Sequence, residues 1–499
     1  MSILLALILI TILIVDRLIA RISKNDIPWY LSPTVWLVTP WILCALVFSA
    51  PIIVHREEIN VYHIFYISIS VAAFVVGCNT LEFIRGRNSI NLTLNQQIVS
   101  PKVRLLKRFF LLGMVGGIFI IYDNLAISGI SLKDRLLGTG LSAARDFAFD
   151  SQIQGVRGPF FLLEPLSGFG LIFLLLYLHS RFSGAIPEGK KKLYFVFALM
   201  TVLMAVFNSL VISGGRMGIV LLFIVLGQMF LFDRRRTIII WVKGKKLSSK
   251  FFLIGTLSAL LLSAVVLLGT VYVQKRSNDQ SPISSLYLGH RAELEPWLLA
   301  VTQNDDQIRY GLFTISYITT PLATLSLYLD LKENQMPGPF YGQYNFPGIA
   351  DRIVKRIDKD SFVMWWDARL EVFAPLLRLG YGGNVWATLL RDLAADVGRP
   401  FVPFFMFLFG FLCRIAVVRA YRYSDPYWTA IGSALLCVAL FSAFHSLLYI
   451  LTVTNLLLLG GALIILEWFN SLWRRGAVST LRYGKKPMAV HRGKNANAS

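Results

Sequence analysis

An arginine separates two long apolar runs in the segment NSLVISGGRMGIVLLFIVLGQMF. Arg216 follows Gly214 and Gly215 and precedes a run that predicts a membrane helix from about Met217. A positive charge at a helix N-terminus opposes the helix dipole, so a compensating anion is expected beside it. Glycine N–H groups, a helix N-terminus and a planar guanidinium together suit a phosphate. The alternative is a side chain that extends to lipid headgroups.

A second group of charges lies in the segment YLGHRAELEPW. His290, Glu293 or Glu295 would serve as the base for an incoming hydroxyl, and Arg291 as the cation for a departing phosphate. Arg276 precedes this group and adds a further cation for the same phosphate. The alternative is a solvated amphipathic helix in which Arg291 and Glu295 form an i,i+4 ion pair.

Aromatic residues alternate with carboxylates across the following hundred residues. An aromatic ring stacks on the apolar face of a sugar while nearby acids accept hydrogen bonds from its hydroxyls. The expected sugar-binding aromatic residues are Trp297, Tyr317, Tyr341, Tyr344, Trp365 and Trp366. Aromatic anchors at a membrane interface would give the same pattern. Arg352 and Arg356 are four residues apart, so on a helix they would share a face and hold one diphosphate.

The elements that must position these residues are membrane helices. Hydrophobic residues make up 56% of the 499, charged residues 15%, and the mean hydropathy is +0.62, which together predict a polytopic membrane protein. The first apolar run lacks a basic n-region and a cleavage site, so we expect a retained anchor. Eleven spans are predicted, at about 3–15, 33–54, 61–81, 109–127, 160–178, 194–213, 216–232, 251–273, 401–418, 427–444 and 450–467.

The basic residues indicate the orientation of these spans. With the N-terminus outside, the inner side receives 30 of the 49 Lys and Arg residues but 7 of the 28 Asp and Glu residues. The net charge of +21 is therefore a positive-inside signature, and it gives no support to nucleic-acid binding. We expect a first transmembrane bundle at 1–273, a large outer loop at 274–400, a second bundle at 401–467 and a basic inner tail at 468–499.

The outer loop is expected to contain helical or re-entrant segments. It holds 14 of the 28 acidic residues, and its most apolar stretch, YGLFTISYITTPLATLSLYLDL, would reverse the later topology if it crossed the membrane once. Pro321 within this stretch predicts a break.

The sequence contains few signals for other chemistry. The four cysteines lie in apolar runs without a Cys-x-x-Cys or Cys/His cluster, and no phosphate-loop or dinucleotide motif occurs, so neither a metal nor a cofactor is expected. Asp123 is the main ionisable residue expected inside a span, whereas an ion-coupled transporter usually needs more.

Three pieces in order resemble the Wzy-type polymerases of oligosaccharide repeat units, the O-antigen polymerase family. They are SGGRMG at 213–218, YITTPLATLSLYL at 317–329 and GGNVWATLLRDLAADVG at 382–398. They are similar to that family's Ser-Gly-x-Arg-Gly turn, its Tyr and Pro ahead of a second aromatic residue, and its Gly-Asn-Val-Tyr-Thr start with an Asp-Phe-Gly end. The last piece contributes Asn384 and Asp396 as candidate sugar contacts, and Asp396 also as a candidate acceptor base.

The resemblance implies an all-α, GT-C-like inverting glycosyltransferase that needs no metal ion. Its substrates would be an undecaprenyl-diphosphate-linked oligosaccharide donor and acceptor, joined at the periplasmic face of the bacterial inner membrane. Membrane lipids and a chain-length regulator would be its other partners. Arg216 and Arg291 would meet the charge of the leaving diphosphate, with Gly214, Gly215, Arg276, Arg352 and Arg356 binding it.

Two other functions remain open from the sequence. An O-antigen ligase-like transferase would use the same donor with a different acceptor. A transporter or flippase of the lipid-linked oligosaccharide belongs to another class, but the scarcity of charge inside the spans argues against it.

Overall fold

The computed structural model describes residues 1–23, 27–85, 103–136, 158–182, 186–212, 222, 224–225, 227–228, 232, 292–301, 316–381, 387–423, 425–448, 450, 453–466 and 469. These residues are mostly helical, as expected for an all-α membrane protein. Among them, four helices are long and apolar enough to cross a membrane: Ser2–Ile22, Val61–Thr80, Leu105–Ser128 and Arg399–Arg422. Shorter apolar helices occur at Pro33–Ser49, Tyr427–Phe441 and Val453–Leu466.

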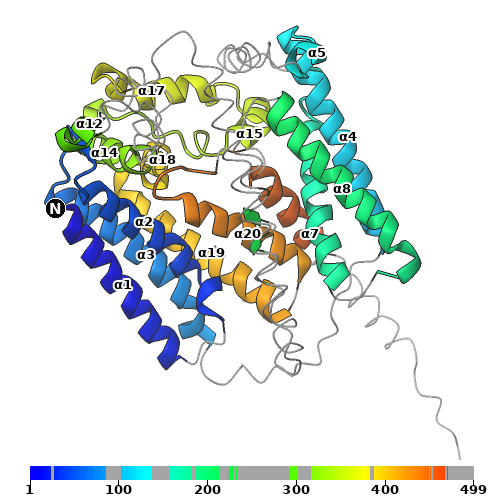
Figure 1. Ribbon diagram of the computed structural model, residues 1–499, viewed down its shortest axis with the longest axis horizontal. Coiled ribbons are helices and arrows are strands. Elements are labelled where there is room, and N and C mark those ends of the chain that lie inside the picture. The colour runs from blue at the N-terminus through cyan, green and yellow to red at the C-terminus, as the bar shows by residue number, and fades with distance from the viewer. Residues whose placement is uncertain are drawn as a thin grey trace, which may run out of the picture.

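One group of helices contains segments from before and after the large loop (Figure 1). Its members are α1 (Ser2–Ile22), α2 (Pro33–Ser49), α3 (Val61–Arg85), α19 (Val402–Tyr423) and α20 (Pro426–Phe441). Helix α19 lies against α3 and α20, while α2 packs on α1 and α20. The helices after the large loop are therefore packed among those that precede it.

The contact between α3 and α19 depends on glycine. A Cβ atom on Gly77 would collide with the carbonyl oxygen of Phe407, and one on Gly410 would collide with that of Phe74. Small residues allow two helix backbones to approach closely, which favours association in a membrane, where lipid is as apolar as the side chains.

A second group consists of α4 (Val103–Ser128), α7 (Gly168–Phe182) and α8 (Lys191–Phe207), which pack on one another and meet the first group where α7 contacts α20. The expected span at 160–178 begins later than predicted. Turns occupy 159–163 and a 3-10 helix, η3 (Glu164–Ser167), follows before α7 starts. Pro165 lies at the start of η3, where its missing N–H costs little.

Short elements cover one end of the helices, and we call residues 292–301, 316–381 and 387–397 the cap (Figure 1). Strand β1 (Ile53–His55) pairs antiparallel with β2 (Ala292–Leu294), so that Val54 lies opposite Glu293. The principal cap helices are α12 (Pro296–Val301), α14 (Ser316–Asp330), α17 (Trp365–Arg378) and α18 (Leu389–Val397). The shorter cap elements are η6 (Glu333–Gln335), α15 (Pro347–Ile349), η7 (Ala350–Val354) and α16 (Lys355–Ile357). The remaining short helices are η1 (Trp29–Leu31), α5 (Leu132–Leu136), η4 (Glu188–Lys190), η5 (Asn208–Ile212) and η8 (Arg399–Phe401).

Helix α14 is continuous through Pro321, so the predicted break at this proline is wrong. Pro321 lies inside the helix and leaves one backbone hydrogen bond unmade, but packing on both sides keeps the flanking turns helical. The helix packs against α2, α17 and α18, which places the apolar loop segment between cap and bundle.

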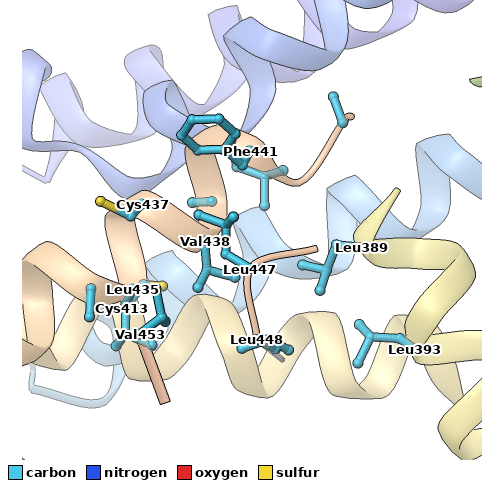
Figure 2. Packing of buried hydrophobic residues seen from close by; sticks show 14 of the residues in the cluster. Leu389, Leu393, Cys413, Leu435, Cys437, Val438, Phe441, Leu447, Leu448 and Val453 are labelled. Carbon is cyan, nitrogen blue, oxygen red and sulfur yellow. The ribbon is translucent and has the colours of Figure 1, made fainter. Parts of the chain in front are cut away.

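Helix α18 is buried on all sides. All residues from 389 to 396 are buried, and Thr388 caps its N-terminus by accepting a hydrogen bond from the backbone N–H of Arg391 at 3.2 Å. Leu389 and Leu393 belong to the same hydrophobic cluster as Leu447 and Leu448 of the turn after α20 (Figure 2). Gly398 ends the helix with φ of 81°, a conformation that favours glycine.

The bundle also contains a buried acid that the predicted span boundaries left outside. Asp16 lies within α1 and is 2% exposed. Its carboxylate accepts hydrogen bonds from Thr34 Oγ1 at 3.1 Å and Asn79 Nδ2 at 2.9 Å, and it pairs with Arg17. This network joins α1, α2 and α3. The four cysteines, Cys44, Cys78, Cys413 and Cys437, are buried free thiols.

Candidate functional site

Several of the predicted site residues lie outside the described residues: Gly214, Gly215, Arg216, Arg276, His290, Arg291 and Asn384. The structure does place the chain that leads to Arg216. Arg135 of α5 is buried and donates hydrogen bonds to the carbonyl oxygens of Ile212 and, at 3.0 Å, Asn124. Helix α5 lies at the cap end of α4 (Figure 1), and the hydrogen bond from Arg135 holds Ile212 beside α5.

Glu293 and Trp297 lie at the edge of the cap, beside β1. The carboxylate of Glu293 is 3.5 Å from Nη2 of Arg56, and both side chains are largely exposed, so this ion pair contributes little to stability. The indole Nε1 of Trp297 donates a hydrogen bond to the carbonyl oxygen of Pro51 at 3.1 Å. These contacts leave the Glu293 carboxylate accessible from outside the fold.

Arg352 has a different role from that of its predicted partner Arg356. Its Nη1 donates to the carbonyl oxygen of Gly348 at 2.9 Å, its Nη2 donates to that of Phe161 at 3.2 Å, and its Cζ lies 4.3 Å from the centroid of the Phe161 ring. Arg352 thereby joins the cap to the turn before α7, whereas Arg356 is exposed. A shared diphosphate would require Arg352 to break these contacts.

The predicted sugar-binding aromatic residues differ in accessibility. Tyr341 is 80% exposed, whereas Tyr344 is 2% exposed and stacks on Phe340 with ring centroids 6.2 Å apart. In this structure a sugar has access to the ring of Tyr341 but not to that of Tyr344. Tyr317 lies on α14, and Trp365 and Trp366 begin α17.

Asp396 of α18 organises the turn at 341–345. Its carboxylate accepts hydrogen bonds from the backbone N–H of Tyr344 at 3.0 Å, from that of Asn345 at 2.9 Å and from Asn345 Nδ2 at 2.6 Å. Burial raises the pKa of Asp396, and the hydrogen bonds from Asn345 and Tyr344 oppose this shift. These contacts give Asp396 a structural role, in addition to its predicted role as a sugar contact or acceptor base.

The most buried charges in the cap belong to Arg391 and Asp392, two residues that were not predicted as site residues. Their side chains are 0% and 2% exposed, and Nη2 of Arg391 lies 3.4 Å from Oδ1 of Asp392. The guanidinium carbon of Arg391 lies 4.6 Å from the ring centroid of Phe373 in α17. Burial raises the pKa of Asp392 to about 6 despite Arg391 and Arg369, whose positive charges lower it.

Further polar groups surround this pair. Asn345 donates through Nδ2 to the carbonyl oxygen of Asp392 at 2.9 Å and accepts through Oδ1 from Ser446 at 3.2 Å. His445 lies in the turn after α20, and burial together with the nearby Arg369 and Arg391 charges lowers its pKa to about 3. At neutral pH this imidazole is therefore uncharged.

The structure brings together residues from distant parts of the chain here. Leu389 N–H donates to the carbonyl oxygen of Ser442 at 2.8 Å, and Ser446 N–H donates to that of Ala387 at 3.0 Å. Trp41 Nε1 of α2 donates to the Ser442 hydroxyl at 3.0 Å. A sequence signal for the site existed, since the LLRDLAAD segment places two acids and an arginine in an otherwise apolar helix.

Within the described part of the chain, no three His, Cys, Asp or Glu side chains lie close enough together to hold a metal ion. Comparison of the chain with models of protein families, with curated protein sequences and with solved structures finds no match.

Proposed function

We propose that the protein is a membrane glycosyltransferase that polymerises undecaprenyl-diphosphate-linked oligosaccharide repeat units into a surface polysaccharide. In this proposal the chain has eleven spans and a GT-C-like fold in the bacterial inner membrane, with the cap on the periplasmic side. The observation that supports it best is the cluster of ionisable side chains buried where the cap meets the bundle: Arg391, Asp392, Asp396 and His445. Burial of ionisable groups is costly, and such groups gather at functional sites, so this cluster is the best-supported candidate site.

The position of the cap suits a substrate that is anchored in lipid. A lipid-linked diphosphate lies at the headgroup level, where the ends of membrane helices meet the aqueous phase. Ile212, four residues before Arg216, is held by Arg135 of α5 at the cap end of α4. The sequence resemblance and the cap therefore favour the same end of the bundle for the reaction.

In the proposed reaction an acceptor sugar hydroxyl attacks the anomeric carbon of the donor chain. The new glycosidic C–O bond forms as the bond to the lipid diphosphate breaks, and the diphosphate leaves with the bonding electrons. The hydroxyl proton passes to His290, Glu293 or the departing diphosphate. Arg216 and Arg291 stabilise the charge on the leaving group, and loss of one such contact lowers the rate by about a hundredfold or more.

The experiment is complementation of a deletion strain with wild type, Arg216→Ala, Arg216→Lys or the control Arg378→Ala, which changes an exposed arginine at the end of α17. Membrane levels are matched, and surface polysaccharide is separated by length. We expect wild type and Arg378→Ala to give a ladder and both Arg216 variants to give single repeat units, because lysine lacks the bidentate fork.

Two outcomes reject the polymerase, and a third rejects only the role of Arg216. A deletion strain in which even single units are missing from the acceptor indicates a ligase. Repeat-unit lipid that stays on the cytoplasmic side indicates a flippase. A normal ladder in both Arg216 variants removes Arg216 from the diphosphate site.

A further inference from the structure

We propose that Arg391 anchors a buried phosphate-binding site between α17, α18 and the turn at 442–448. This site is distinct from the predicted diphosphate site, whose arginines are at 216, 276, 291, 352 and 356. The identity of the molecule that carries the phosphate rests on the proposed function, whereas the phosphate chemistry rests on the residues around Arg391.

The first observation is an unmet hydrogen-bonding capacity. Arg391 is 0% exposed, and within the part of the chain that the structure describes its Nε and Nη1 atoms have no hydrogen-bond partner. These two atoms carry three of the five N–H donors of a guanidinium. A buried charged donor without a partner is strongly unfavourable, so a ligand that accepts from it is expected.

The second observation is weak compensation of the charge. Arg391 contacts Asp392 through Nη2 at 3.4 Å, which is long for a hydrogen bond between charged groups. The neighbouring carboxylate of Asp396 is already occupied by Tyr344 and Asn345. The imidazole of His445 is uncharged at neutral pH and does not neutralise the charge of Arg391. The described carboxylates therefore leave Arg391 only loosely paired.

The third observation is a second guanidinium at the same ring. The Cζ atom of Arg369 lies 4.9 Å from the centroid of Phe373, and that of Arg391 lies 4.6 Å from it. The two Cζ atoms are therefore no more than about 10 Å apart. Two neighbouring cations favour a ligand with more than one negative charge, so a phosphate or diphosphate fits better than a single carboxylate.

The test measures binding of inorganic pyrophosphate to the purified full-length protein at pH 7, in a detergent without phosphate groups, by titration calorimetry. We expect wild type and the exposed-arginine control Arg378→Ala to bind equally. Arg391→Ala should weaken binding by about tenfold or more, which corresponds to loss of one charge-assisted contact.

The variant Asp392→Asn tests the site through a gain of affinity, which misfolding cannot produce. It removes the carboxylate that competes with the ligand for Arg391, so pyrophosphate should bind more tightly than to wild type. An increase in affinity cannot result from damage to the fold. Unchanged or weaker binding in Asp392→Asn, with a normal elution profile, would contradict the site.

Two further outcomes overturn the proposal. Absence of pyrophosphate binding to folded wild type at millimolar concentration indicates that Nε and Nη1 bond water only. Binding of glucuronate that depends on Arg391, without binding of pyrophosphate, indicates a carboxylate site. Competition between pyrophosphate and a polyprenyl diphosphate in mixed micelles distinguishes a lipid-linked source from free phosphate.

The same variants separate this site from the proposed function. If Arg391 is required for pyrophosphate binding but Arg391→Ala retains a normal polysaccharide ladder, the phosphate site stands without a role in polymerisation. If binding is absent while the Arg216 variants lose the ladder, the polymerase stands and the Arg391 site is rejected.

Discussion

Replacement of Asp396 by asparagine distinguishes a structural acid from a catalytic one. In the folded protein Oδ1 accepts from the backbone N–H of Tyr344, and Oδ2 accepts from both the backbone N–H and Nδ2 of Asn345. An asparagine side chain keeps one oxygen acceptor but turns an NH₂ group toward donors. At least one hydrogen bond is lost, and two donors then face each other.

The magnitude follows from these contacts. A hydrogen bond to a charged group contributes about 1.5–3 kcal/mol, and each buried donor left unsatisfied costs about 1–3 kcal/mol. Relief of the buried negative charge offsets part of this loss, because burial already raises the pKa of Asp396. We therefore expect Asp396→Asn to lower the free energy of unfolding by about 2–4 kcal/mol.

The measurement is thermal unfolding of the detergent-solubilised protein, with Asp360→Asn as the control because Asp360 is exposed in the nearby turn. We expect a lower Tm for Asp396→Asn and an unchanged Tm for the control. A variant that melts with wild type yet makes no polysaccharide would refute the structural role and support acid–base chemistry at Asp396.

Three more substitutions test the fold and its charges. Gly77→Ala should prevent close packing of α3 on α19 and so reduce the yield of folded protein in size-exclusion chromatography. The control Gly461→Ala, at a position with open space, should leave the yield unchanged. Equal yields of the two variants would contradict the close contact. Burial raises the pKa of Asp392 from 3.8 to about 6. Below pH 4 the carboxyl is protonated in both states, and as the pH rises through 6 the unfolded state loses the proton first, so the free energy of unfolding falls by about 3 kcal/mol. Asp392→Asn should remove this slope in melts between pH 4 and 7, and a slope that persists would reject the assignment to Asp392. His63→Phe should lower the free energy of unfolding by about 1–3 kcal/mol, since the buried ring bonds Asp330 at 2.9 Å, and an unchanged Tm would show that this contact is dispensable.

The helices of the bundle follow from local composition. Predicted spans at 33–54, 61–81, 109–127, 401–418 and 427–444 each overlap a helix of the structure, because an apolar run in a membrane must satisfy its backbone hydrogen bonds within itself. The boundaries were less predictable. Helix α7 starts only at Gly168, since Glu164 and Pro165 form a separate 3-10 turn before it.

The candidate site depended on contacts between residues far apart in the sequence. The sequence by itself determined that the chain is a mostly helical membrane protein, because hydrophobicity and run length are local properties. Only the tertiary structure showed that Asp396 accepts hydrogen bonds from residues 51 and 52 positions earlier, and that Arg391 lies against α17 and near the turn after α20. Burial and hydrogen-bond satisfaction depend on which distant elements surround a side chain, so the number of unmet donors on Arg391 appears only in the folded protein.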